Sequence, residues 1–145
     1  MSPGTLKLAA ETPDLGSSLT VGAGTIEYDR NDGNAQNIFD VAYNNLEIDG
    51  SGDKDIGANL TVNDTLTITN GTLDLRGSDG LGNFNLVATD FLMTGGTLEA
   101  GSSVAHTVSG TWNETGGTFT PIEGTFTFDG TGDITQSLGN NFFNL

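Results

Sequence analysis

The stretch that decides the fold is residues 65–75 (TLTITNGTLDL), which align without a gap on residues 90–100 (DFLMTGGTLEA) at an offset of 25. In residues 65–75 apolar residues alternate with polar ones, and in both segments a glycine-containing turn separates two short runs. Alternation with a period of two is typical of a β-strand with one buried face. A strand–turn–strand unit that recurs along a chain predicts a repeat fold in which each unit stacks on the next.

Three further matches extend the repeat to most of the chain. Residues 94–98 (TGGTL) match residues 115–119 (TGGTF) at an offset of 21, and residues 16–19 (GSSL) match residues 101–104 (GSSV). An imperfect super-repeat joins residues 24–46 to residues 124–145 with one gap and an offset of 100 at its start. In it Thr25, Asp29, Gln36 and Leu46 recur as Thr125, Asp129, Gln136 and Leu145.

The dipeptide Gly-Thr marks the units. It occurs eight times, against roughly three expected from composition alone. A large apolar residue follows most copies, as in Leu6, Ile26, Leu73, Leu98, Trp112, Phe119 and Phe126. Each unit therefore consists of a turn glycine, an outward threonine suited to an exposed strand, and an inward core residue.

These patterns predict an all-β fold, a parallel β-solenoid of about six coils that forms a single domain over residues 1–145. Each coil would hold two or three short strands, hydrogen-bonded in parallel to the next coil at a spacing of about 4.8 Å. We expect it to be a right-handed β-helix. An antiparallel sandwich of equally short strands is the alternative, but sandwich strands need no common coil period and this chain has one.

Composition excludes several functions. The chain has 145 residues, four Lys and Arg against 19 Asp and Glu, a formal charge of −15 and no Cys. Four scattered basic residues cannot form a nucleic-acid-binding face. The absence of Cys excludes cysteine-based zinc sites, disulfides and thiol chemistry. No apolar run approaches the ~20 residues of a transmembrane helix.

The ends of the predicted solenoid suggest a mode of assembly. A solenoid ends in open parallel edges that must be capped, charged or paired. The repeat stops at residues 142–145 (FFNL), whereas the earlier copy continues as residues 46–50 (LEIDG). We therefore expect head-to-tail pairing with copies of the chain or with flanking repeats of a longer one, a contact that does not close and gives a filament. The candidate contact residues are Leu6, Leu8, Leu19, Val21, Phe142, Phe143 and Leu145.

Residues 124–136 (GTFTFDGTGDITQ) and 65–75 resemble the degenerate repeats of large secreted bacterial surface proteins with right-handed parallel β-helix folds. Autotransporter passengers and filamentous-haemagglutinin-like adhesins are examples. The resemblance covers residues 16–145 and implies an extracellular or cell-surface location with an adhesive, spacer or matrix role. It supplies no motif residues to carry over.

Two acidic turns are candidate Ca²⁺ sites. Asp49, Asp53 and Asp55 alternate with glycine and lysine in one turn, and Asp129 and Asp133 flank a Gly-Thr-Gly in another. Oxygen ligands at alternating positions suit a hard cation such as Ca²⁺. The plain alternative is a solvated turn, in which Asp and Gly are ordinary residues. A Ca²⁺- or glycan-binding adhesin module is therefore the second functional hypothesis, and no other cofactor is expected.

Catalysis is the weakest hypothesis. Enzymes that act on polysaccharides also use parallel β-helices, but paired carboxylates arise by chance among so many acids and only four bases are present. We therefore expect no enzymatic activity. His106 shares the phase of its apolar neighbours, which favours a structural role. Trp112, Tyr28 and Tyr43 could form a carbohydrate-stacking face, but Trp112 and Tyr28 hold the phase of core residues.

Overall fold

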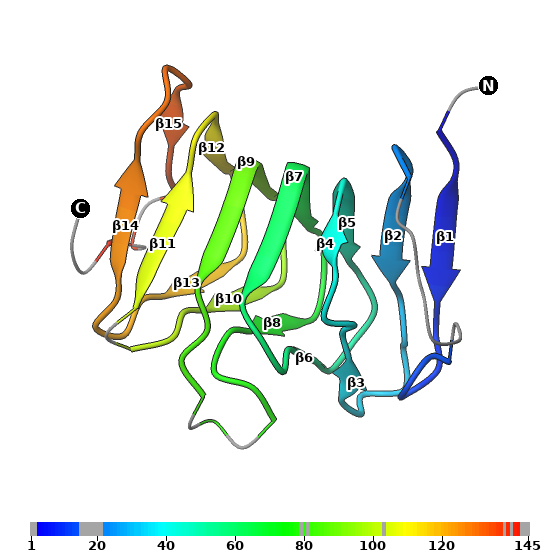
Figure 1. Ribbon diagram of the computed structural model, residues 1–145. Coiled ribbons are helices and arrows are strands. Elements are labelled where there is room, and N and C mark those ends of the chain that lie inside the picture. The colour runs from blue at the N-terminus through cyan, green and yellow to red at the C-terminus, as the bar shows by residue number, and fades with distance from the viewer. Residues whose placement is uncertain are drawn as a thin grey trace.

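The computed structural model describes residues 3–14, 22–78, 80, 82–102, 104–137, 139 and 141–142. Within these residues every strand pair is parallel and no helix occurs, so none could span a membrane. The chain winds into about six coils that stack along one axis, with the termini at opposite ends (Figure 1). The prediction of an all-β parallel β-solenoid is confirmed.

Each coil has up to three short strands, and the strands of successive coils form three faces. Face 1 consists of β4 (Ala42–Tyr43), the first part of β7 (Leu60–Ile68), the first part of β9 (Leu86–Met93), β11 (Ala105–Val108) and β14 (Thr125–Phe128). Face 2 consists of β1 (Thr5–Leu8), β2 (Thr25–Tyr28), β5 (Asn45–Ile48), the second parts of β7 and β9, β12 (Trp112–Glu114) and β15 (Ile134–Thr135). Face 3 consists of β3 (Gln36–Asn37), β6 (Asp53–Asp55), β8 (Thr72–Asp74), β10 (Thr97–Glu99) and β13 (Thr118–Thr120).

Strand register explains the sequence repeats. Thr65 pairs with Asp90, and Thr72 pairs with Thr97, which is the offset of 25. Thr97 in turn pairs with Thr118, which is the offset of 21. The longer coil arises where the chain runs from β8 to β9, and the described residues of this connection, 76–78, 80 and 82–85, project from the lower edge in Figure 1.

The super-repeat has a different structural basis. Residues 25–28 form β2 on face 2, whereas the matching residues 125–128 form β14 on face 1. The same local pattern of a glycine followed by alternating threonine and apolar residues therefore builds strands on two different faces. The match of residues 16–19 with 101–104 lies partly outside the described residues.

The core is a set of ladders in which one inward residue from each coil stacks on the next. The clearest ladder runs along face 2 through Leu6, Ile26, Leu46, Leu66, Phe91, Trp112 and Ile134. Its five inner members are at most 6% exposed. Stacking is needed because a single coil has no second layer against which to bury its apolar side.

Glycine is required where the coils turn. Gly71 has a φ of +68°, and a Cβ there would lie 2.4 Å from the carbonyl oxygen of Gly50 in the coil before. Gly50 has a φ of +75° and is crowded in the same way by Arg30. Positive φ and a close backbone approach both favour glycine, so these corners explain part of the glycine content.

Candidate functional site

The two ends of face 2 form the candidate site. Among the described residues, β1 pairs only with β2, and β15 pairs only with β12. Each strand therefore has one edge without a partner in this part of the chain. Leu6 is 43% exposed and Ile134 is 51% exposed, although both belong to the inward ladder whose other members are buried. These two exposed residues are thus the terminal members of that ladder.

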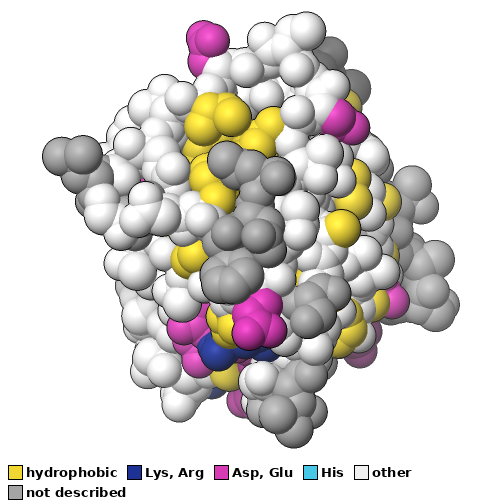
Figure 2. Space-filling view, turned by 90° about the vertical axis from the view of Figure 1, so that its left-hand side faces the viewer, with side chains coloured by type: hydrophobic (Ala, Val, Ile, Leu, Met, Phe, Trp, Pro, Cys, Tyr) yellow, Lys and Arg dark blue, Asp and Glu magenta, His cyan; other side chains and the backbone are white. Residues whose placement is uncertain are grey.

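The other predicted contact residues are distributed differently. Leu8 is buried, because it lies inside the first coil in register with Tyr28. Leu19, Val21, Phe143 and Leu145 lie outside the described residues. Phe142 is half-buried and packs within its own chain. Figure 2 views the C-terminal end of the solenoid and shows apolar side chains at its surface.

Phe142 packs over an aromatic cluster that fills the last coils. Its ring centroid lies 5.1 Å from that of Trp112, 5.3 Å from Phe119 and 5.4 Å from Phe126. Trp112 stacks on Phe91 of the coil before, with centroids 4.0 Å apart. Offset and edge-to-face pairs of this kind add about 0.5–1.5 kcal/mol each beyond burial. Phe142 therefore covers part of the end of the core and leaves Ile134 exposed.

The aromatic residues considered for carbohydrate stacking are all internal. Trp112, Tyr28 and Tyr43 have no measurable exposure. The hydroxyl groups of Tyr28 and Tyr43 lie 2.9 Å apart, and that of Tyr43 donates to the carbonyl oxygen of Phe39 at 2.9 Å. Burial raises the pKa of both phenols. These three rings cannot form a surface for sugar binding in this fold.

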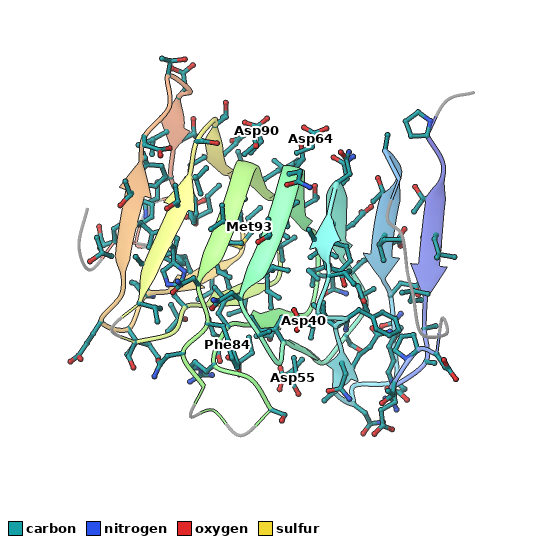
Figure 3. The ribbon with its side chains drawn as sticks, viewed as in Figure 1. Asp40, Asp55, Asp64, Phe84, Asp90 and Met93 are labelled. Carbon is teal, nitrogen blue, oxygen red and sulfur yellow. The ribbon has the colours of Figure 1, made fainter. Side chains whose placement is uncertain are left out.

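The acidic candidates for Ca²⁺ are spread over the solenoid. Asp49, Asp53 and Asp55 lie in the coil of β5 and β6, whereas Asp129 and Asp133 are exposed in the last coil. No group of three or more His, Cys, Asp or Glu side chains is arranged to hold a metal among the residues the structure covers. Asp55 at the lower edge of Figure 3 is buried, and burial followed by the charge of Asp74 raises its pKa.

Acidic side chains of successive coils stack on one another along face 3, and an arginine pairs with two of them. Asp55, Asp74 and Glu99 lie in register on β6, β8 and β10. Arg76 donates to Asp74 at 3.0 Å and also pairs with Glu99. On face 2, Glu27 pairs with Lys7, and Glu47 stacks beside it. Burial, then the charges of Glu27 and Asp49, raise the pKa of Glu47. Acids thus stack on acids, with bases placed between some of them.

Sequence reasoning missed two buried polar residues in the first coils. Lys54 has no exposure, and its Nζ donates to the carbonyl oxygen of Ser51 at 3.0 Å, with longer contacts to those of Arg30 and Gly52. Burial lowers its pKa. Gln36, in register with Lys54, donates to the carbonyl oxygens of Leu8 and Ala10. The phase of β6 was the available signal, because Lys54 precedes the inward Ile56 by two residues.

His106 has a structural role, as predicted. It is fully buried, stacks on Phe126 with ring centroids 4.4 Å apart, and its Nδ1 accepts a hydrogen bond from the backbone N–H of Leu86. Burial lowers its pKa to about 4, against the opposing effect of a backbone hydrogen bond with Gly101. The ring is therefore neutral at neutral pH and acts as a core side chain.

Comparison with known proteins adds no family to this description: no protein-family model matches the chain, and neither a curated protein nor a solved structure matches it. The function is therefore inferred from the fold and from the two open ends of face 2.

Proposed function

We propose that this chain is a structural building block that extends end to end, through the open edges of its solenoid, into a filament or a longer rod. The partner is a second copy of the chain or a flanking repeat of the same kind. Parallel edge strands present backbone groups that pair with another strand of the same direction. A contact between opposite ends does not close on itself, so it propagates.

One observation supports this proposal above the others. The inward ladder of face 2 begins at Leu6 and ends at Ile134, and these two members alone in it are exposed. The terminal residue at each end of this buried ladder is apolar and exposed, as an inward residue is when no further coil is stacked on it. Placing another coil on either end would remove such apolar surface from water, which stabilises the joint.

We further propose that the rod acts outside the cell as a spacer, matrix component or adhesin, without catalysis. The resemblance of its repeats to those of secreted bacterial surface proteins supports this location. The charge of −15 favours rods that repel one another sideways and stay soluble. End-to-end contact must overcome the same repulsion, so we expect salt to promote it by screening.

Sedimentation velocity tests this proposal, with the protein concentration varied from micromolar to millimolar at low and at physiological salt. Electron microscopy of the same samples shows the shape of the species. We expect elongated species that lengthen with concentration and with salt. Leu6→Asp and Ile134→Asp should each abolish them. Val87→Asp is the matched control, because Val87 is 45% exposed on face 1, away from both ends. A chain that stays monomeric under all conditions, or equal effects of the three variants, would refute the proposal.

A further inference from the structure

We propose that copies join in one fixed register, in which Leu6 of one copy stacks on Ile134 of the next and Asp133 accepts a hydrogen bond from the backbone N–H of Thr5. This inference rests on the proposed end-to-end function and goes beyond it by assigning the residues that set the joint. In this register β1 of one copy pairs in parallel with β15 of its neighbour, and the face 2 sheet continues across the joint.

The ladder itself favours this register. Every step along face 2 stacks one inward residue of a coil on the equivalent residue of the next, from Leu6 and Ile26 at one end to Trp112 and Ile134 at the other. A shift by one residue would place a core residue opposite an outward one, because side chains alternate between the two sides of a strand. Stacking Leu6 on Ile134 is the register that repeats what the solenoid does internally.

A hydrogen-bond pattern at the corner that precedes this ladder favours the same register. The Oδ1 of Asn45 accepts the backbone N–H of Thr65 in the next coil at 3.2 Å. The Oδ1 of Asp90, at the upper corner in Figure 3, accepts the backbone N–H of Thr111 at 2.7 Å. In each case the side-chain oxygen of an Asn or Asp accepts a hydrogen bond from the backbone N–H of a threonine. That threonine occupies the equivalent position one coil further on, in the column of residues that precede the ladder.

The joint supplies the third copy of that pattern. Asp133 immediately precedes Ile134, as Asp90 precedes Phe91, and Thr5 immediately precedes Leu6, as Thr111 precedes Trp112. Placing Leu6 on Ile134 therefore brings the carboxylate of Asp133 to the backbone N–H of Thr5. Hydrogen bonds to a carboxylate are stronger than those between neutral groups, so Asp133 would favour this register over its neighbours.

Nothing among the described residues of the chain requires a glycine at position 4. Gly110 precedes Thr111, and a Cβ on it would lie 2.2 Å from the Oδ1 of Asp90. Gly132 and Gly24, in the same column, would likewise collide with the carbonyl oxygens of Gly110 and Gly4. Gly4 precedes Thr5 but has nothing within 4 Å of its Cβ position and no positive φ. The proposed joint gives Gly4 the crowded surroundings that Gly24, Gly110 and Gly132 already have.

Cross-linking tests the register directly, because the chain contains no cysteine. Neighbouring Cα atoms across a parallel pair lie about 4.8 Å apart, within the range of about 4.4–6.8 Å that a disulfide spans. A chain carrying Leu6→Cys and Ile134→Cys should form covalent multimers on mild oxidation. Leu6→Cys with Val87→Cys is the control for random collision, and Leu8→Cys with Ile134→Cys is the control for a slipped register.

Substitutions at two positions separate the joint from the fold. Gly4→Ala should leave thermal unfolding of the single chain unchanged and weaken association at least tenfold. Asp133→Asn keeps an acceptor, as Asn45 does, and should associate nearly as well as the parent, whereas Asp133→Val should weaken association by a similar factor to Gly4→Ala.

The outcomes distinguish the two proposals. If the parent chain forms filaments but the Leu6–Ile134 pair cross-links no better than either control, or if Gly4→Ala leaves association unchanged, the register is wrong and end-to-end assembly stands. If the parent chain does not associate at all, the proposed function fails and the register fails with it.

Discussion

Replacement of Phe91 by alanine tests the inward ladder at its centre. Phe91 is 1% exposed, lies between Leu66 and Trp112 in the ladder, and stacks on the Trp112 ring at 4.0 Å. Truncating a buried phenylalanine to alanine leaves a cavity and lowers the free energy of unfolding by about 3–5 kcal/mol. Loss of the stacked aromatic pair accounts for about 1 kcal/mol of that decrease. We expect Phe91→Ala to lower the free energy of unfolding by about 4 kcal/mol, and Phe91→Leu by about half as much.

The assay is urea unfolding followed by fluorescence and by circular dichroism. Trp112 is the single tryptophan, so fluorescence reports the coils next to the substitution while circular dichroism reports all strands. In a stack stabilised by nearest neighbours the last coils should unfold first, so the two transitions should separate in Phe91→Ala. Val87→Ala is the control, because Val87 lies on the same strand with its side chain outward. A cost for Phe91→Ala below about 1 kcal/mol, or no larger than that of Val87→Ala, would refute the stacked core.

Three further predictions concern single residues of the interior and corners. The pKa of His106 falls from 6.5 to about 4 on folding. Between these two pH values the imidazole binds a proton in the unfolded chain but not in the folded one. The free energy of unfolding should therefore decline by up to about 3 kcal/mol as pH drops from 6.5 to 4. His106→Phe should remove that decline in pH-dependent thermal unfolding, and an unchanged profile would contradict it. Burial raises the pKa of Asp55 above 3.8, so Asp55→Asn should increase the free energy of unfolding at neutral pH. This increase should disappear as pH falls through the raised pKa. An equal increase at neutral pH and at pH of about 3 would show that the ionised carboxylate is not its cause. Gly71→Ala should lower the free energy of unfolding, measured by chemical denaturation, by more than about 1 kcal/mol, because Gly71 has a φ of +68°. Gly57→Ala should lower it by less, because the Cβ position of Gly57 has open space around it. Equal decreases for the two variants would count against the corner geometry.

Strand type and stacking could be predicted from sequence because the same local pattern recurs at coil spacing. The alignment of residues 65–75 with 90–100 corresponds to the register of β7 with β9 and of β8 with β10. The phase of alternation also predicted the burial of Trp112, Tyr28 and His106. Periodicity identifies which side of a strand faces inward, since side chains alternate with a period of two.

The assignment of strands to faces could not be predicted in this way. Residues 25–28 and 125–128 share a pattern, yet they lie on different faces, because corner and loop lengths decide where a strand falls on the coil and pattern alone does not encode them. The burial of Lys54 was missed for a different reason: composition treats lysine as a surface residue, whereas here three backbone carbonyl oxygens surround its ammonium group. Tertiary contacts of this kind have no local signature.

The candidate site was predicted in part. Leu6 was identified as an end residue from the open edge expected of any solenoid, and it is exposed there. Ile134 was not identified, because the sequence places it within a repeat, and only the pairing of β15 with β12 shows that it ends the ladder. Phe142 was expected to contact a neighbour, and its packing against Trp112 and Phe126 shows that it also covers its own core.

X-ray diffraction from aligned filaments of the parent chain tests the central claim most directly. Face 2 contributes seven strands per copy, so at about 4.8 Å per strand a continuous solenoid predicts an axial repeat of about 34 Å. We expect a strong reflection near 4.8 Å along the filament axis together with orders of that longer repeat. A 4.8 Å reflection perpendicular to the axis, or an axial repeat that does not match seven strands, would contradict a rod built by stacking coil on coil.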